Sequence, residues 1–217
     1  ASGSLKQSTN QRAEQYEEPS SILNRLQTNN YKSTNTMAKQ ADPNQLVLVD
    51  VRLAFPSLFT PKELDGKERY ESTYLLDKKA DKKQLVAIHE IIERLIEDEF
   101  DGDSPGPARL PIQDGDEKSY DGYAGNFALG ANRSASQGRP VVLKKDKTPA
   151  AESDGIIYGG CYVNAVVRFY AINGKNAKKK GPGGKRVCCS VEIVHFNHDG
   201  ARFGAPAADI DVLPDID

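Results

Sequence analysis

Aromatic and cationic side chains share one face of a predicted strand, residues 158–172, in the second half of the chain. Side chains alternate between the two faces of a strand, which places Tyr162, Arg168 and Tyr170 together. The opposite face carries only small and apolar residues. One apolar face and one Tyr/Arg face are typical of a half-exposed sheet that binds a ligand. Because tyrosine rings stack on bases and arginines bind phosphates, the pattern favours single-stranded nucleic acid.

A strongly basic loop joins this strand to a second predicted strand, residues 186–196. Alternation in that strand places one set of side chains on a common face: Val187, Cys189, Val191, Ile193 and His195. The loop contains six cations and no acid: Lys175, Lys178, Lys179, Lys180, Lys185 and Arg186. A lysine cluster is more often a solvated loop without a partner. This one connects the two strands that carry Arg168 and Arg186, so we expect it to contact phosphates and to make binding salt-dependent.

Four more side chains belong to the candidate surface because they are aromatic or cationic and lie in or beside predicted strands. They are Tyr74, Tyr123, Phe59 and Arg133. Base stacking on a ring needs no sequence preference, so the expected binding tolerates any base. The alternative is that each of these rings fills the core or the rim of a barrel.

The formal net charge of −2 hides an uneven distribution of charge along the 217 residues. Eleven cations and three acids fall between residues 139 and 186, whereas the last nine residues hold four aspartates and no cation. The basic stretch indicates a polyanionic partner. For the acidic tail, residues 205–217, we expect either a solubilising role or a DNA mimic. A mimic would cover the basic surface until DNA releases it to recruit replication and recombination proteins.

The cysteines do not predict a metal site or a disulfide framework. All three fall in predicted strands, where a free cysteine in a reducing compartment behaves as a small apolar residue. Cys188 and Cys189, with His195 and His198, could suggest zinc. Adjacent residues on a strand face opposite sides, however, so both cysteines cannot bind one ion without a bulge. We therefore expect no metal and no cofactor.

Two carboxylates, Asp114 and Asp116, offer a different chemistry, because clustered carboxylates coordinate Mg²⁺ in nucleases and resolvases. Gly115 between them marks a tight turn, which is the favoured interpretation. The sequence contains no nucleophile elbow, P-loop or dinucleotide fingerprint, so we expect a binding protein and no enzyme. A Mg²⁺-dependent nuclease is one alternative, and a scaffold that binds proteins through its acidic tail is another.

Five or six short strands and one helix must position these side chains. The first strand is predicted over residues 46–55, and the prolines and glycine around the next segment predict a loop over residues 57–67. The helix begins at Asp81, with Gln84 as its capping-box partner, and an apolar stripe runs from Leu85 to Phe100. Acidic residues lie off that stripe, so the helix is scaffold. We predict a mostly β fold: an OB-like, five- to six-stranded small barrel with one α-helix and long loops. An open α+β sheet is the alternative.

The chain divides into three parts by composition. Residues 1–36 lack periodic apolar spacing and are interpreted as a leader, a fusion remnant or a disordered extension, because Met37 resembles a natural start. Residues 37–204 form the predicted OB-like domain, and residues 205–217 form the acidic tail. We find no apolar run long enough to cross a bilayer and predict no membrane association.

Four segments resemble a phage-encoded family: residues 51–61, 110–117, 123–127 and 158–164. That family was long known only as a domain of unknown function and is associated with phage single-stranded DNA-binding proteins of OB fold. The resemblance covers roughly residues 46–204. It implies that the chain protects single-stranded DNA during phage replication, recombination or repair in the cytoplasm of the infected bacterium. It supplies no list of contact residues, and it leaves the oligomeric state and the choice of DNA over RNA open.

Overall fold

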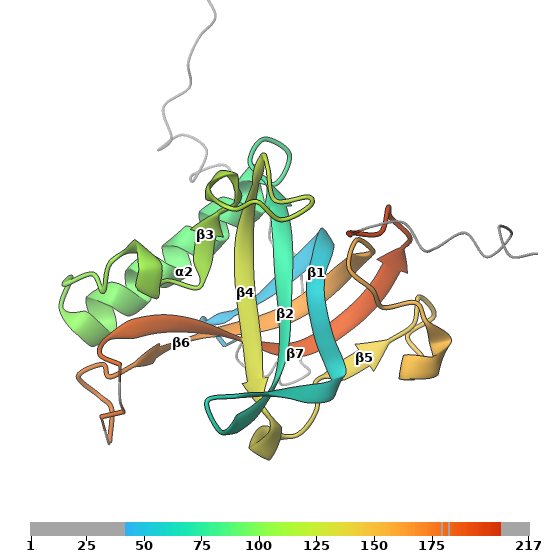
Figure 1. Ribbon diagram of the computed structural model, residues 1–217. Helices are drawn as coiled ribbons and strands as arrows, with labels where there is room; N and C mark the ends of the chain where they lie inside the picture. The colour runs from blue at the N-terminus through green and yellow to red at the C-terminus, as the bar shows by residue number, and fades with distance from the viewer. Residues whose placement is uncertain (1–41, 179, 182, 205–217) are drawn as a thin grey trace, which may run out of the picture. The chain divides into compact units, whose positions relative to one another are not determined.

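The computed structural model describes residues 42–178, 180–181 and 183–204 (Figure 1). The predicted leader, the acidic tail and Lys179 lie outside these residues. The described part contains one seven-stranded sheet and one α-helix, α2 (Lys82–Phe100). The strands are β1 (Gln45–Leu64), β2 (Lys67–Asp77), β3 (Ile112–Asp114), β4 (Asn126–Ser134), β5 (Val141–Leu143), β6 (Tyr162–Ile172) and β7 (Arg186–His198). Short 3₁₀ turns are η1 (Pro107–Arg109), η2 (Gly115–Glu117), η3 (Ala135–Gln137) and η4 (Glu152–Asp154).

The strand order is β3-β4-β2-β1-β6-β7-β5, with all pairs antiparallel except β5 and β7. The predicted mostly β fold with one helix is confirmed, but the sheet has seven strands and its hydrogen bonds do not close it into a barrel. β3 and β5 form its two edges. β4 and β7 lie close together without pairing, which leaves an open seam between them. β3 and β5 have three residues each, too few to show an alternating pattern in the sequence.

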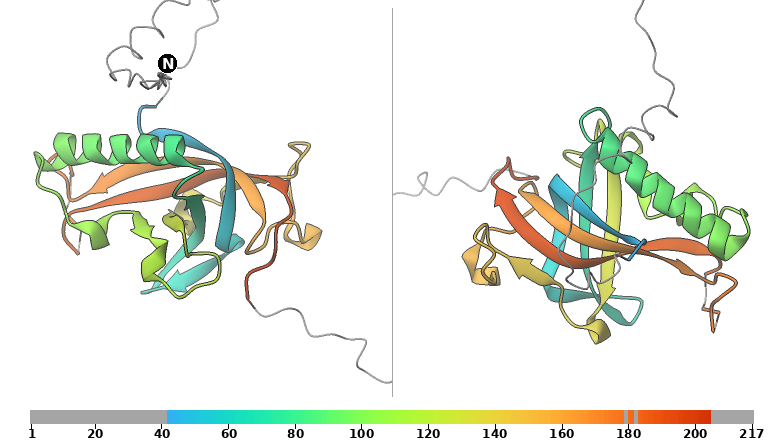
Figure 2. Two further views of the ribbon diagram at one scale, coloured as in Figure 1. Left: turned by 90° about the horizontal axis from the view of Figure 1, so that it is seen from above. Right: turned by 180° about the vertical axis from the view of Figure 1, so that it is seen from behind.

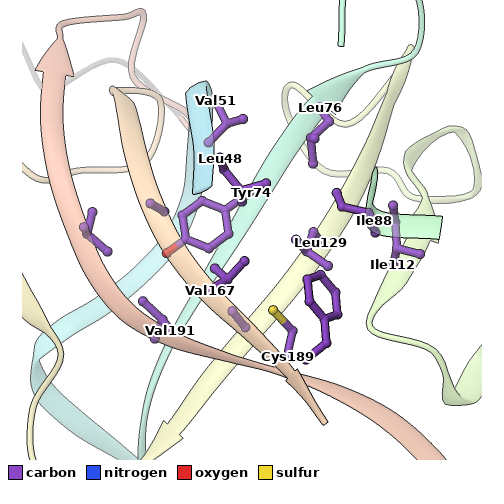
Figure 3. Packing of buried hydrophobic residues seen from close by; sticks show 14 of the residues in the cluster. Leu48, Val51, Tyr74, Leu76, Ile88, Ile112, Leu129, Val167, Cys189 and Val191 are labelled. Atoms are coloured by element: carbon purple, nitrogen blue, oxygen red, sulfur yellow. The ribbon is translucent and has the colours of Figure 1, made fainter. Parts of the chain in front are cut away.

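The inner faces of the strands point into one apolar interior. In β6 the predicted alternation is confirmed, because Val163, Val167 and Phe169 are at most 1% exposed. Tyr74 and Leu129 reach the same interior from β2 and β4 (Figure 3). Burial of each such side chain contributes about 1.5–3 kcal/mol, so this packing holds the sheet in its curled form.

α2 lies alongside β6 and β7 and packs its apolar stripe on the core (Figure 2). The predicted stripe is confirmed by the burial of Leu85, Ile88, Ile92 and Leu95. The predicted capping box is wrong. The Asp81 carboxylate accepts hydrogen bonds from the Asp77 backbone N–H and from the Gln84 amide and makes no capping bond to the helix. Gln84 instead bonds both backbone groups of Val49 and so ties α2 to β1.

β1 continues far beyond the predicted strand and includes most of the segment predicted as a loop, residues 57–67. Its pairing with β2 has two register shifts, and Pro56 and Pro61 lie within them. A proline cannot donate to the ladder, so bulges of this kind accommodate it. Asp65 and Gly66, both at positive φ, then form the two-residue turn that leads into β2.

A bulge in β7 also changes one predicted face. Val166 of β6 pairs with Ile193, whereas the next residue, Val167, pairs with Val191, so Glu192 is the extra residue. The bulge shifts the inward-facing positions by one residue, so that Val194 is buried after Val191. The prediction that Ile193 and His195 continue the inner face is therefore wrong.

Candidate nucleic-acid interface

A cleft of about 1110 Å³ lies at the open seam of the sheet, and we call it the charged cleft. Four segments meet there: the β1–β2 hairpin, the end of β4 with η3, and the outer faces of β6 and β7. Its cations are Lys67, Arg69, Arg133, Arg168 and Arg186, and its acids are Asp65, Glu68 and Glu192. Thus the structure brings together four residues that the sequence singled out: Arg133, Arg168, Tyr170 and Arg186. An excess of cations in a cleft attracts a polyanion.

Arg168 is held between two carboxylates. Its Nε lies 2.7 Å from Glu192, and its Nη1 pairs with Asp42 at the start of the domain. These partners raise the pKa of Arg168, with the Glu192 hydrogen bond as the largest cause. The other Glu192 oxygen accepts a hydrogen bond from Gln45. Arg168 is therefore already neutralised locally, and a phosphate would have to compete with two acids for it.

Tyr170 presents a half-buried ring beside Arg168 and Cys188. Burial raises the pKa of its phenol to about 12, with smaller contributions from the neighbouring Cys188. The hydroxyl is therefore protonated at neutral pH. A neutral ring that is partly exposed in a cation-lined cleft suits stacking against a base.

Arg133 and Arg186 make no ion pair among the described residues. Arg133 donates hydrogen bonds to the carbonyls of Gly138 and Gln137 and thereby anchors the turn after β4. These carbonyls are neutral, so the guanidinium keeps its full charge toward the cleft. Arg186 opens β7 and lies near Gly183 of the basic loop. The two arginines face the cleft from opposite sides of the seam.

The basic loop is anchored on the acidic end of α2. Lys175 pairs with Asp101 and Lys185 with Asp103, each at 2.7 Å. Both pairs are exposed, and such surface pairs contribute about 0–1 kcal/mol, so they break readily in favour of a stronger anion. Lys178 and Lys180 are exposed, and Lys179 lies outside the described residues.

A second cleft of about 480 Å³ adjoins the first, and we call it the aromatic cleft. Phe55 and Tyr120 are 50% and 55% exposed, and their ring centroids lie 5.2 Å apart in an edge-to-face arrangement. Tyr123, a predicted site residue, is buried beneath them, with its centroid 5.2 Å from that of Tyr120. Arg69 and Asn132 line both clefts, so the two are continuous.

Tyr162 lies at the opposite end of β6 from the charged cleft. Its ring stacks on His198, with centroids 4.4 Å apart, and the Arg52 guanidinium lies 6.0 Å from its centroid. Six residues of a strand separate it from Arg168, a distance of roughly 20 Å. The structure therefore does not bring Tyr162 together with Arg168 and Tyr170, although all three share a face as predicted.

Two other predicted aromatics lie away from both clefts. Tyr74 is fully buried in the core and accepts a hydrogen bond of 3.0 Å from the Ser72 hydroxyl, so its ring is not available to a ligand. The prediction that Tyr74 contacts DNA is therefore wrong. Phe59 packs against the core, and the Arg139 guanidinium covers its ring at 5.6 Å.

The two carboxylates of the rival nuclease hypothesis are held by a lysine. Lys78 bonds both Asp114 and Asp116, and it lies 2.6 Å from the latter. Lys78 is the largest cause of the lowered pKa of Asp114, and the Gly125 N–H is the largest cause for Asp116. Asp114 also caps η2 by accepting a hydrogen bond from the Asp116 N–H. The contacts are those of a structural turn.

No group of three or more His, Cys, Asp or Glu side chains in the described ranges is arranged to hold a metal ion. Cys189 is buried while Cys188 faces the charged cleft, which agrees with the expected opposite orientation of adjacent strand residues. Likewise, no helix in the described part of the chain is both long and apolar enough to cross a membrane.

Sequence reasoning missed Phe55, Tyr120 and Arg69. Phe55 stands at a bulge of β1 with a positive φ of 47°, where the alternation that identifies a face is broken. Tyr120 precedes Tyr123 by three residues in a Gly/Asp-rich loop, and this aromatic pair was the available signal. Arg69 lies on the β2 face opposite Tyr74, which was the only residue of that strand in the predicted site.

Comparison with known proteins gives a consistent result. The family model described as Enterobacter phage Enc34, ssDNA-binding protein, matches residues 44–214. Protein p50 of Acyrthosiphon pisum secondary endosymbiont phage 1 is 34% identical over 184 residues, which cover 79% of this chain and 94% of that protein.

Solved structures of the single-stranded DNA-binding protein from bacteriophage Enc34 resemble the fold. The structure in complex with ssDNA has a TM-score of 0.63 and 26% identity, covering 74% of this chain and 90% of that one. A second structure of the same phage protein has a TM-score of 0.63 and 25% identity, covering 78% of this chain and 89% of that one.

Proposed function

The chain belongs to the family of the Enterobacter phage Enc34 ssDNA-binding protein, and we propose that it binds single-stranded DNA without sequence preference. The observation that carries the proposal is the family match across residues 44–214 together with a cation-lined cleft at the seam of the sheet. No bond is made or broken in this activity. Its role is to cover single strands during phage DNA replication, recombination or repair inside the infected bacterial cell.

The charged cleft supplies the electrostatic part of the proposed binding. Arg69, Arg133 and Arg186 line it without a carboxylate partner among the described residues. Each arginine that neutralises one phosphate of a single strand lowers the slope of log affinity against log salt by about 0.7. The three together give a slope of about −2.1, and further contacts by the basic loop would steepen it.

Tyr170 supplies a stacking surface within the same cleft. Base stacking on an aromatic ring contributes about 1–3 kcal/mol per base and accepts every base, because each has a π-face. The combination of stacking and phosphate neutralisation explains why neither a sequence preference nor a cofactor is needed.

The acidic tail, residues 205–217, has a proposed role in regulation. It carries four aspartates and no cation among its last nine residues, and the described chain ends at Gly204 beside Asp121. We propose that the tail competes with DNA and recruits replication or recombination proteins once DNA displaces it. Deletion of residues 207–217 is expected to tighten binding, and an unchanged affinity would contradict this role.

Fluorescence polarisation with a labelled oligo-dT tests the proposed function. We expect saturable binding whose affinity falls roughly 20-fold or more between about 50 and 200 mM salt, as three neutralised phosphates require. A duplex of the same length should compete poorly. Absence of binding to oligo-dT at low salt would overturn the proposal.

A further inference from the structure

We propose that the aromatic cleft is a base-stacking subsite, where Phe55 and Tyr120 hold a base of the strand whose phosphates lie in the charged cleft. This inference rests on the proposed function and adds a second, separate point of contact. The aromatic cleft is lined by three rings and Pro111, with Lys62, Arg69 and Glu71 at its polar side. Its volume of about 480 Å³ lies in the range of about 300–1,000 Å³ that is usual for small-ligand sites.

The two outer rings are held open toward the solvent by the structure beneath them. Tyr123 is 5% exposed, and its ring lies 5.2 Å from Tyr120 and 6.1 Å from Phe55. Burial raises the pKa of Tyr123, and the neighbouring Thr73 side chain partly offsets this rise. Tyr123 therefore acts as a floor, and it keeps Phe55 and Tyr120 from collapsing into the core.

The backbone of β1 is also arranged to present Phe55 outward. Its φ of 47° lies in the left-handed region, which is uncommon for a residue other than glycine. The register of β1 against β2 shifts at the same place. Bulges of this kind re-aim a side chain, and here the result is a large apolar ring that is half exposed.

Continuity with the charged cleft identifies the occupant. Arg69 and Asn132 line both clefts, so a chain that leaves the charged cleft past Arg69 reaches the aromatic rings directly. Lys62 is paired with Glu71 at 3.1 Å, whereas Arg69 has no carboxylate partner among the residues described. A partner that alternates anionic and planar apolar groups fits this order of side chains, and single-stranded DNA is such a partner.

Replacement of Tyr120 tests the subsite. Loss of one stacked base lowers affinity about 5- to 150-fold, so we expect Tyr120→Ala to weaken oligo-dT binding within that range. Tyr120→Phe keeps the ring and should bind like the wild type. The slope of log affinity against log salt should stay unchanged in both variants, because neither removes a phosphate contact. Val86→Ala on α2, at 56% exposure, is the matched control.

A direct signal is available because the chain contains no tryptophan. In Tyr120→Trp the introduced indole is the sole tryptophan, and we expect saturating oligo-dT to quench its fluorescence by stacking. Wild-type affinity in Tyr120→Ala together with no quenching in Tyr120→Trp would overturn the subsite and leave a protein as the occupant of the cleft. Wild-type binding would then still support the proposed function. Failure of the wild type itself to bind oligo-dT would overturn both.

Discussion

The charged cleft and the aromatic cleft are neighbours that share Arg69 and Asn132, yet they differ in nearly every other respect. The first is lined by four arginines and a lysine, and the second by three aromatic rings. Phosphate neutralisation depends on salt, whereas base stacking does not. The charged cleft therefore combines phosphate contacts with the single ring of Tyr170, whereas the aromatic cleft offers mainly stacking, so mutations in the two clefts should differ in their effect on the salt dependence of the proposed DNA binding.

The largest effect is expected when positive charge is removed from the charged cleft alone. Arg133→Ala combined with Arg186→Ala should weaken oligo-dT binding by about 150-fold or more at low salt, since each lost charge-assisted hydrogen bond costs about 1.5–3 kcal/mol and two are lost. The salt slope should become shallower by about 1.4. Polarisation titrations at several salt concentrations measure both quantities.

A second double variant with the same change in net charge distinguishes the effect of the charged cleft from that of overall charge. Lys82 and Lys83 are exposed at the start of α2 and line neither cleft. Lys82→Ala combined with Lys83→Ala should leave the slope almost unchanged. An equal loss in the two double variants would mean that overall charge, and not the charged cleft, sets the affinity.

A smaller effect, of opposite sign, is expected from Glu192. The Glu192 carboxylate lies 2.7 Å from the Arg168 Nε, and Asp42 is the second acid that pairs with this guanidinium. Glu192→Gln therefore removes one of these two ion pairs and leaves the pair with Asp42. We expect oligo-dT to bind about three-fold tighter at low salt, a gain of about 0.6 kcal/mol. Glu90→Gln on the exposed side of α2 gives the same change in net charge. Equally tight binding in both variants would show that the change in net charge, and not the release of Arg168, strengthens DNA binding.

The smallest effect concerns the ionisation of Tyr170. Its pKa is raised to about 12 in the folded chain from an ordinary value of 10, so the folded state favours the protonated phenol. The associated stability is fully present below about pH 10 and is lost as pH rises toward 12. Tyr170→Phe should therefore lose less thermal stability than the wild type between pH 9 and 11, as followed by circular dichroism. Parallel losses would contradict the burial of this hydroxyl.

The sequence predicted those parts of the fold where the apolar period is unbroken. The stripe of α2 and the inner face of β6 follow regular spacing, and both are confirmed. The segment at Pro56 and Pro61 was predicted as a loop because prolines usually end strands, and only the bulges explain their place inside β1. Bulges depend on the partner strand, so a single sequence does not reveal them.

In the candidate site, the sequence predicted which face of a strand a residue lies on, but not the contacts that the residue makes. Alternation correctly placed Arg168 and Tyr170 on the outer face of β6, but it gave no sign that Asp42 and Glu192 would neutralise Arg168. Alternation also does not say which face of a strand is buried. Tyr74 was assigned to the candidate surface only because it is an aromatic residue of a predicted strand, whereas its hydroxyl bonds Ser72 inside the core.

Salt titrations on two probes test the central claim most directly: oligo-dT, and an abasic deoxyribose-phosphate chain of the same length. The abasic chain keeps every phosphate and lacks every base. If phosphate neutralisation and base stacking contribute independently, the two plots of log affinity against log salt should be parallel, with oligo-dT tighter by a constant factor of about five or more. Coincident plots would show that the bases contribute nothing, and different slopes would show that stacking and phosphate neutralisation are not independent; either result would contradict the account.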